Sequence, residues 1–344
     1  MKRELLLTGM ALALGVFAVG QEKKDPPKAK PPRIALNDPK MVAASADYPI
    51  QGEYEGEIVL NSGPKKVGAQ VIARGEGNFA IRVLSGGLPG AGWDGKTILH
   101  EVTAKTDQDK VVVTGKDLSG SIENGMLKLK DGMKVDTTLK RVERTSPTLG
   151  EKPPSGAVVL FEKPEDVAKW KDAQIVELSD GKFLACTPGK NIVTEAAFKN
   201  FKVHIEFRLA WMPNSTGQGR SNSGLYLQNR YELQMLDSFG LKGENNECGG
   251  FYTQFSPSVN MCLPPQVWQT YDIDFTTAEF GADGKKSKPA RTTVKHNGVV
   301  IQDNVELKGS TPGGKPEENT PGPLHLQWHG DPVVYRNIWV VEAK

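Results

Sequence analysis

The chain has 344 residues with 43 basic and 41 acidic side chains, so its formal net charge at pH 7 is only +2. This length exceeds what one ordinary domain needs and favours two domains. Outside a Lys- and Pro-rich segment near the start there is no long basic run, which excludes a typical nucleic-acid-binding protein.

The first twenty residues, MKRELLLTGMALALGVFAVG, predict a secretory signal peptide over residues 1–20. A charged start precedes an apolar run from Leu5 to Val19, and the small residues Ala18 and Gly20 suit cleavage. This run is shorter than the roughly 20 residues that a membrane-spanning helix needs. No cysteine follows it for lipid attachment. We therefore expect an exported protein, periplasmic or extracellular, with no membrane span once the signal is cleaved.

Residues 21–44 are rich in Lys and Pro and poor in apolar side chains. Such a segment buries too little surface to offset its ordering, so we expect a mobile tether. From Tyr48 to Glu143, short alternating runs are separated by Gly, Asn and Asp, which predicts a small all-β sandwich or barrel. No concentration of His, Asp or Glu marks a site there, so residues 45–144 are interpreted as an accessory domain.

The segment Gly86–Lys96 contains too many glycines for a strand and predicts a loop within this domain. Its Trp93 and Asp94 could contact a sugar, because an exposed indole stacks on the apolar face of a pyranose ring. The favoured alternative is a turn held by a buried Trp93, since tryptophan is usually largely buried.

A Pro-, Gly- and Ser-rich linker over residues 145–156 separates this domain from a second one over residues 157–344. In the second domain Phe201–Leu209 alternates apolar and polar residues without a break, which predicts a half-buried strand. Its polar side includes His204 and Glu206. These could belong to a site, but the favoured alternative is a face that meets water.

The stretch NSGLYLQNRYELQMLDSFG, from Asn222 to Gly240, predicts a β-hairpin. Its strands are expected over Gly224–Gln228 and Tyr231–Leu236. Alternate side chains point to opposite faces, so one face is apolar and the other carries hydrogen-bonding groups. That polar face either meets water or presents the groups of a sugar-binding sheet. The groups in question, with those that flank the strands, are Asn222, Tyr226, Glu232, Gln234 and Asp237.

Two strands near the end carry the remaining candidates. The alternation in Leu324–His329 puts His325, Gln327 and His329 on one face, and Val333–Val341 carries Arg336. Two histidines and a glutamine on one face of a strand favour a site. The alternative is a sheet surface on which these groups only form hydrogen bonds.

Three cysteines are present, Cys186, Cys248 and Cys262. In an exported protein a Cys248–Cys262 disulfide is possible, with Cys186 left as a buried thiol. No Cys-x-x-Cys or paired Cys/His spacing indicates structural zinc.

Five blocks of the second domain belong together. They are the hairpin stretch, CGGFYTQ at Cys248–Gln254, WQTYDIDF at Trp268–Phe275, HNGVVIQDNVEL at His296–Leu307 and PGPLHLQWHGDPVVYRNIWV at Pro321–Val340. With these blocks in this order, the chain resembles the 3-keto-disaccharide hydrolase family, formerly a domain of unknown function, over roughly Ala157 to Lys344. The resemblance implies a concanavalin A-like jelly-roll β-sandwich, preceded here by the smaller all-β accessory domain.

The resemblance also implies the substrate, a glycoside whose sugar carries a ketone at carbon 3. That ketone acidifies the hydrogen on carbon 2, so a base can remove it, the aglycone can leave by β-elimination, and water can add afterwards to give net hydrolysis. Such a reaction needs a base, a group that stabilises the enolate and an acid. A separate oxidoreductase must first make the ketone.

For these roles we select three residues and expect them to share one pocket. His329 is the candidate base because imidazole titrates in a suitable range, and Arg336 is the candidate enolate stabiliser because it is a permanent cation. Glu232 is the candidate acid, or it supports His329. A divalent metal held by His329 with Glu232 or His325 is possible instead, but no spacing selects an ion. The candidate substrate-binding residues are Asn222, Tyr226, Gln234, Asp237, Gln327 and His325.

One residue departs from the family pattern. An acidic residue often precedes the histidine of the LQ-x-HG block, and Trp328 stands at that position here. A chain that binds sugar without cleaving it is therefore an alternative, and so is a structural surface protein, because one fold hosts several functions.

Overall fold

The computed structural model describes residues 33–60, 63–132 and 136–343, and the chain from Arg33 onward forms one compact unit. Most of its regular structure is antiparallel strand, with one short helix and two 3-10 turns. The predicted signal peptide over residues 1–20 lies outside the described residues. Within the described ranges, no helix combines the length and apolar character needed to cross a membrane.

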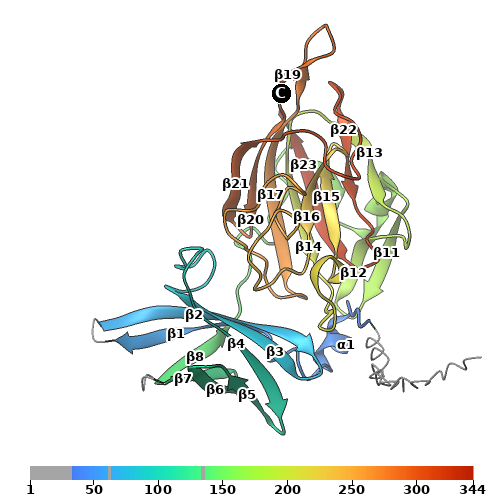
Figure 1. Ribbon diagram of the computed structural model, residues 1–344. Helices are drawn as coiled ribbons and strands as arrows, with labels where there is room; N and C mark the ends of the chain where they lie inside the picture. The colour runs from blue at the N-terminus through green and yellow to red at the C-terminus, as the bar shows by residue number, and fades with distance from the viewer. Residues whose placement is uncertain (1–32, 61–62, 133–135, 344) are drawn as a thin grey trace, which may run out of the picture. The chain divides into compact units, whose positions relative to one another are not determined.

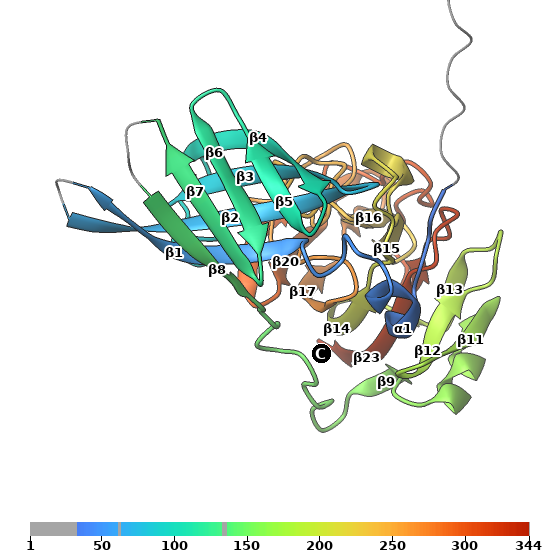
Figure 2. The same ribbon diagram turned by 90° about the horizontal axis from the view of Figure 1, so that it is seen from below.

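The first eight strands form a closed antiparallel barrel, coloured blue to green in Figure 1. Each strand pairs with the next one along the chain, and β1 also pairs with β8, which closes the barrel. Figure 2 shows β5 to β8 side by side. The strands are β1 (Gly52–Leu60), β2 (Gly63–Gly75), β3 (Asn78–Ser85), β4 (Ile98–Asp107), β5 (Lys110–Thr114), β6 (Leu118–Glu123), β7 (Met126–Asp131) and β8 (Asp136–Val142).

The interior of the barrel follows from the period-two pattern of its strands. Val67, Ala69 and Val71 of β2 point inward and pack with Phe79 and Ile81 of β3 in one apolar cluster. Closure leaves no open sheet edge in this eight-stranded path, which protects a small domain from edge-to-edge pairing. The small all-β domain predicted from the sequence is thus a barrel.

The rest of the chain forms an antiparallel β-sandwich. One sheet has five strands, in the order β10-β13-β22-β15-β16. These are β10 (Trp170–Lys171), β13 (Ile192–Phe198), β22 (Gly322–Leu326), β15 (Ser223–Leu227) and β16 (Tyr231–Met235). A 3-10 turn, η1 (Pro164–Lys169), precedes β10, and a small pair, β18 (Glu279–Phe280) with β19 (Lys286–Lys288), stands apart.

The second sheet of the sandwich has eight strands. Seven follow the order β11-β12-β23-β14-β17-β20-β21, and β9 pairs with β23 beside this path. The strands are β9 (Val158–Phe161), β11 (Ala173–Leu178), β12 (Gly181–Cys186), β14 (Phe201–Arg208), β17 (Trp268–Thr276), β20 (Arg291–His296), β21 (Val299–Glu306) and β23 (Val334–Glu342).

The sandwich core lies between the inner faces of these two sheets. Val203 and Ile205 of β14 and Leu233 and Met235 of β16 belong to one continuous apolar cluster. Their polar neighbours, such as Glu206 and Glu232, point the opposite way because alternate side chains leave a strand on opposite faces. Two outward faces therefore carry polar groups, one on each sheet.

The outward face of the eight-stranded sheet is covered at His204 and Glu206, so the prediction that these two side chains face water was wrong. Lys202 and Asp274 on the same face are exposed. His204 and Glu206 are fully buried. The linker after the barrel covers them: Gly150 N donates to Glu206 Oε1 at 2.6 Å, and Asn337 Nδ2 donates to Glu151 O at 3.0 Å. Strand alternation identifies a face, but it does not reveal what packs on that face.

The described end of the predicted tether is also ordered. Asp38 caps the helix α1 (Pro39–Ala43) by accepting from Lys40 N at 2.8 Å. The same carboxylate accepts from the Ser179 hydroxyl at 2.7 Å, and Leu36 pairs with Trp211. These contacts hold residues 33–44 on the folded protein, whereas the sequence predicted a mobile segment. Residues 21–32 lie outside the described ranges.

The three cysteines are buried and free, so the disulfide considered from the sequence is not formed. The Cys262 thiol instead lies 3.5 Å from Leu236 O, to which it donates in the sandwich core. Cys248 Sγ also lies 3.2 Å from the Tyr271 hydroxyl.

Candidate functional site

A polar pocket lies on the outward face of the five-stranded sheet, over β15, β16 and the end of β22. Its cavity is about 230 Å³, several times the volume of roughly 30 Å³ that one water occupies in the liquid. Six residues selected from the sequence line it together with four others. The lining residues are Gln218, Asn222, Tyr226, Glu232, Gln234, Tyr252, Pro312, Gly313, Gln327 and His329.

The hairpin of β15 and β16 brings the central pair of the pocket together. Tyr226 and Glu232 are cross-strand partners, and the Tyr226 hydroxyl donates to Glu232 Oε2 at 2.9 Å. The turn is tight because Gln228 and Asn229 adopt positive φ angles of 52° and 57°. Gln327, just after β22, donates from Nε2 to the Tyr226 hydroxyl at 3.1 Å. Three strands thus fix the position of this carboxyl group.

Glu232 is a buried carboxyl group without a cationic partner. Only 3% of it is exposed, and no ion pair of the described residues includes it. Burial raises the pKa of Glu232 to about 7, although the hydrogen bond from Tyr226 opposes the rise. The group therefore exchanges its proton near neutral pH, as a general acid or base must.

Amide side chains surround this carboxyl group. Asn222 Nδ2 donates to Gln218 O at 2.8 Å, and Gln234 Nε2 donates to Gln218 Oε1 at 3.2 Å. The amide oxygens of Asn222, Gln234 and Gln327 are buried and have no hydrogen-bond partner among the described residues. An unpaired buried acceptor is costly, so a ligand that donates hydroxyl hydrogens would be stabilised here. Sugar hydroxyls are such donors.

His329 lines this pocket and is exposed to solvent, as Pro312 and Gly313 are. It follows the end of β22, and the next residue, Gly330, has a φ of 89°. Asp331 then accepts from Asn222 N at 2.7 Å, which holds the segment against the start of β15. The His329 imidazole and the Glu232 carboxyl therefore line the same cavity, with His329 exposed to solvent and Glu232 buried.

Two predicted substrate-binding residues do not line the pocket. The His325 ring stacks on Tyr226 with centroids 4.4 Å apart, and its Nδ1 lies 2.8 Å from Asn229 Oδ1. Burial lowers the pKa of His325 to about 4, so its neutral ring supports Tyr226 from behind. Asp237 instead forms a buried ion pair with Arg220, with Nε and Oδ2 2.6 Å apart.

Arg336 lies on a different sheet from the pocket, so the expected grouping with Glu232 and His329 was wrong. It belongs to β23, where Arg336 and Glu206 are cross-strand partners and Arg336 Nε donates to Glu206 Oε2 at 2.7 Å. Its guanidinium also lies 4.1 Å from the centre of the Trp268 ring. Facing sheets are roughly 10 Å apart, and Arg336 points away from the core between them.

Four residues of the pocket were not selected from the sequence: Gln218, Tyr252, Pro312 and Gly313. Tyr252 belongs to the CGGFYTQ block and Pro312 to a Pro/Gly-rich loop, so the sequence did contain a signal for both. Gly313 has a φ of 82°, and a Cβ there would lie 2.8 Å from the Tyr226 hydroxyl. Gln218 belongs to the 3-10 turn η2 (Gly217–Gly219) and carries no sequence signal of its own.

Two of the residues considered from the sequence as metal ligands, His329 and Glu232, line this pocket, and His325 does not. No other His, Cys, Asp or Glu among the described residues lines it. Within the described ranges one group of three such residues is close enough to hold an ion, namely Glu151, His204 and Asp272 on the other sheet. There, however, His204 Nδ1 already lies 2.6 Å from Asp272 Oδ1. We therefore derive no chemical step through a metal.

Comparison with known protein families identifies the second domain. A family model described as the 3-keto-α-glucoside-1,2-lyase-like domain matches residues 156–341. A search of curated proteins found no match to the chain.

Solved structures provide the other matches. A candidate glycosyl hydrolase from Parabacteroides distasonis is 34% identical, covers 55% of this chain and 85% of its own, and has a TM-score of 0.49. A second candidate glycosyl hydrolase from the same organism is 18% identical, covers 55% of this chain and 95% of its own, and has a TM-score of 0.38. The family model spans more than half of the chain, which confirms the resemblance found in the sequence. The chain belongs to the family of 3-keto-α-glucoside-1,2-lyase-like domains.

Proposed function

We propose that this protein is an exported enzyme that cleaves glycosides bearing a ketone at carbon 3 of the sugar. One observation carries the proposal: Glu232 is a buried carboxyl group with a pKa raised to about 7, in a pocket lined by amide and hydroxyl groups. A proton-transfer group of this kind suits removal of the acidified hydrogen on carbon 2. Membership of the lyase-like family supports the same reaction.

In the first step the ionised Glu232 carboxylate takes the proton from carbon 2. The electron pair of the broken C–H bond forms a double bond between carbons 2 and 3, and negative charge moves to the oxygen on carbon 3. Because Arg336 is on the other sheet, donors that line the pocket stabilise this oxygen instead. Among them are the amides of Gln218 and Gln327 and the Tyr252 hydroxyl.

In the second step the ketone at carbon 3 re-forms and the bond from carbon 1 to the aglycone oxygen breaks. That oxygen needs a proton, and His329 at the mouth of the pocket supplies it while the aglycone leaves toward solvent. The remaining sugar has a double bond between carbons 1 and 2. Addition of one water molecule across it places a hydroxyl on carbon 1 and a hydrogen on carbon 2, which completes a net hydrolysis.

The roles of Glu232 as base and His329 as acid are assigned from how deeply each side chain is buried. Glu232 is 3% exposed and lies beneath the sugar ring, whereas His329 is exposed where the aglycone departs. This exchanges the roles given to the two residues from the sequence alone. The three unpaired amide oxygens of Asn222, Gln234 and Gln327 would accept from the sugar hydroxyls.

The test is release of a chromogenic aglycone from a 3-keto-glucoside. We expect Glu232→Gln to lower kcat about 10²- to 10⁴-fold, the range of a single general acid–base group. The replacement keeps the size of the side chain. Arg336→Gln is the matched control, and it should retain the wild-type kcat for the folded fraction. Equal rates in wild-type protein and Glu232→Gln would contradict the proposal, and binding of the keto sugar without release by wild-type protein would favour a carbohydrate-binding protein.

Export and the supply of substrate complete the proposal. The apolar sequence from Leu5 to Val19 motivates export, and detection of mature protein beginning near residue 21 in the periplasm or medium would test it. The ketone requires an earlier oxidation of the hydroxyl on carbon 3, so an oxidoreductase must act before this enzyme.

A further inference from the structure

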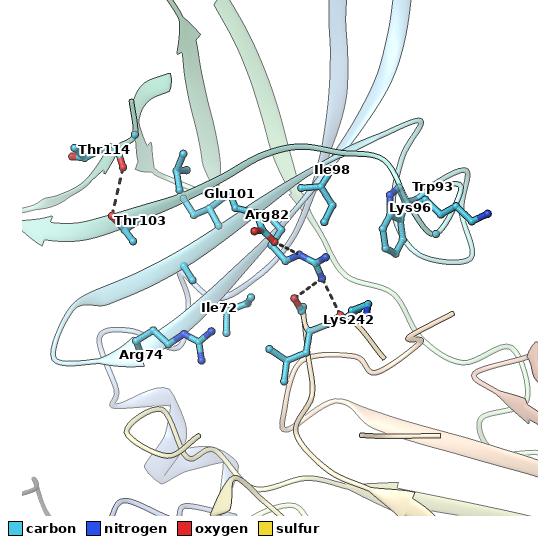
Figure 3. A pocket seen from close by; sticks show the side chains of 17 residues that line it. Ile72, Arg74, Arg82, Trp93, Lys96, Ile98, Glu101, Thr103, Thr114 and Lys242 are labelled. Atoms are coloured by element: carbon cyan, nitrogen blue, oxygen red, sulfur yellow. Dashed lines mark hydrogen bonds and ion pairs between the residues drawn. The ribbon is translucent and has the colours of Figure 1, made fainter. Parts of the chain in front are cut away.

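A larger cavity lies elsewhere, against the barrel. It is about 870 Å³ and is lined by β2, β3 and β4, by the loop that carries Trp93, and by residues Gly240–Lys242. Figure 3 shows Arg74 at one end, Trp93 beside Lys96 at the other, and Arg82 with Glu101 between them. No buried carboxyl group without a partner lines it, so its chemistry differs from that of the pocket at Glu232.

The indole of Trp93 is held by its own loop. Its Nε1–H donates to Thr97 O at 2.9 Å, and Asp94 accepts from Thr97 N at 2.7 Å and from Lys96 N at 2.9 Å. Hydrogen bonds from the Thr97 side chain and from these backbone groups lower the pKa of Asp94 to about 2, so the turn carries a carboxylate at any ordinary pH. Trp93 is only half-buried, contrary to the alternative favoured from the sequence. A ring is therefore presented to the cavity without further ordering.

The cations of this cavity are of two kinds. Arg82 is fully engaged, since it pairs with Glu101 at 3.1 Å and donates to Gly240 O and Leu241 O at 2.8 and 2.9 Å. The side chains of Arg74 and Lys96, in contrast, form no hydrogen bond or ion pair with any described residue. Two free cations thus lie at opposite ends of the cavity. Its one lining carboxylate, Glu101, is paired with Arg82, and the Asp94 carboxylate of the Trp93 loop accepts hydrogen bonds within its own turn.

A second observation concerns Arg74. The protein packed around it, and then the like charge of Arg220, lower the pKa of Arg74, although Asp237 acts in the opposite direction. A negative group beside Arg74 would relieve this repulsion. The apolar lining from Ile72, Ile98 and Val102 adds surface for a ligand that is not purely ionic.

We propose that this barrel cavity binds an acidic oligosaccharide. One sugar ring stacks on Trp93, a carboxylate on that unit or its neighbour pairs with Lys96, and a carboxylate further along pairs with Arg74. The size of the cavity fits more than one sugar unit, and the separated cations fit a repeating anion. This site is distinct from the pocket at Glu232 and does not depend on turnover there.

The test is calorimetric titration of the full chain with an oligogalacturonate, with a neutral cello-oligosaccharide of the same length, and with a sulfated oligosaccharide. We expect the oligogalacturonate to bind at least about tenfold more tightly than the neutral sugar, a difference of about 1.4 kcal/mol. Its affinity should fall as salt is raised. Preferential binding of the sulfated sugar would assign the anion as sulfate and overturn the carboxylate assignment. Inorganic polyphosphate should bind more weakly than the oligogalacturonate, and equal binding would overturn the proposal.

Substitutions of residues that line the barrel cavity test whether the oligosaccharide binds there. Lys96→Gln, Arg74→Gln and Trp93→Ala should each weaken binding about tenfold, since each removes a charge-assisted contact or the stacking surface. Trp93→Phe retains a ring and should recover most of the affinity, which separates stacking from a collapsed loop. Lys110→Gln, an exposed barrel lysine outside the cavity, is the matched control and should bind as the wild type does. Equal losses in the control, or no binding by the wild type, would refute the site.

A last measurement keeps this proposal separate from the proposed function. Glu232→Gln should bind the oligogalacturonate as tightly as the wild type, because Glu232 does not line the barrel cavity. A loss of binding in that variant would show that the sugar occupies the other pocket instead.

Discussion

The two outward faces of the sandwich each bury one glutamate, and these glutamates differ in every other respect. Glu206 on β14 accepts from Gly150 N, Arg336 Nε and Asn337 Nδ2 at 2.6 to 2.8 Å. Glu232 on β16 accepts one side-chain hydrogen bond, from the Tyr226 hydroxyl. Burial raises the pKa of Glu206, but the neighbouring His204, whose Nε2 lies 3.6 Å from Glu206 Oε1, and the hydrogen bonds from these groups outweigh it and lower the pKa to about 2. For Glu232 burial dominates, and its pKa rises to about 7.

The comparison teaches that burial of a charged residue does not by itself indicate function. The network around Glu206 satisfies a charge and holds the interdomain linker on the sheet, which is a structural role. Glu232 is buried without such compensation, in a cavity that a ligand can enter. An uncompensated titratable group in a pocket is the arrangement that favours catalysis.

The largest expected effect tests the structural side of this comparison. Glu206→Gln should lower the free energy of unfolding by about 3 kcal/mol or more, because it leaves Arg336 and His204 without their buried anion. The kcat of the folded fraction should not change, since Glu206 does not line the pocket. Urea unfolding and the aglycone-release assay measure the two quantities. A variant that keeps its stability but loses kcat would reverse the roles of the two glutamates.

The pH dependence of stability separates the two carboxyl groups further. The raised pKa of Glu232 contributes stability that is complete below its ordinary value of 4.5 and is lost as the pH rises through about 7. Glutamine mimics the protonated form. At about pH 8.5, Glu232→Gln should therefore be more stable than the wild type by about 3 kcal/mol, and near pH 4.5 the two should be alike. Unfolding in urea at both values provides the comparison.

The stability that Glu206 contributes should depend on pH in the opposite direction. The lowered pKa of Glu206 contributes stability that is present above 4.5 and lost as the pH falls through about 2. The prediction for Glu232 has its own contrary outcome. If Glu232→Gln is no more stable than the wild type at alkaline pH, the Glu232 carboxyl group is solvated or paired in solution.

A substitution that retains Glu232 but shifts its carboxyl group tests whether the position of that group matters for catalysis. A Cβ on Gly224 of β15 would lie 2.4 Å from Glu232 Oε1 and 2.9 Å from its Cγ. Gly224→Ala should therefore lower kcat roughly ten- to a hundredfold, because small displacements of a catalytic group are costly. Gly219→Ala is the matched control, since a Cβ there meets nothing within 4 Å. Unchanged kcat in both variants would indicate that the position of the carboxyl group is not critical.

Much of the pocket could be predicted because it lies within one hairpin and one strand. The alternation in Tyr231–Leu236 correctly separates Leu233 from Glu232, and the resulting sheet face carries Tyr226 opposite Glu232. Gln327 and His329 were also selected by the period-two rule, but β22 ends at Leu326, so both reach the pocket from the segment after the strand. His325, from the same predicted face, does not line the pocket. Local patterns are sufficient when the residues concerned are neighbours in one sheet.

The failures have one physical cause, which is packing between distant segments. His329 and Arg336 are seven residues apart, but the chain leaves the five-stranded sheet after β22 and enters the eight-stranded sheet at β23. The period-two alternation of the sequence does not indicate that the chain changes sheet between these residues. Burial of Glu206 likewise depends on a linker that precedes it by more than fifty residues. Alternation predicts which way a side chain points but not what covers it.

The smallest expected effect concerns the single hydrogen bond that Glu232 accepts. The Tyr226 hydroxyl lowers the pKa of Glu232, so Tyr226→Phe should raise that pKa further, by up to about one unit. Because the ionised carboxylate is the base, the acid limb of the kcat/KM profile should move to higher pH by the same amount. Tyr231→Phe is the matched control, because its hydroxyl donates to Glu317 at 2.7 Å and faces the other way. If instead the acid limb moves equally in Tyr226→Phe and Tyr231→Phe, or in neither, Glu232 does not set that limb. The contrast between Glu206 and Glu232 would then no longer explain which face of the sandwich is catalytic.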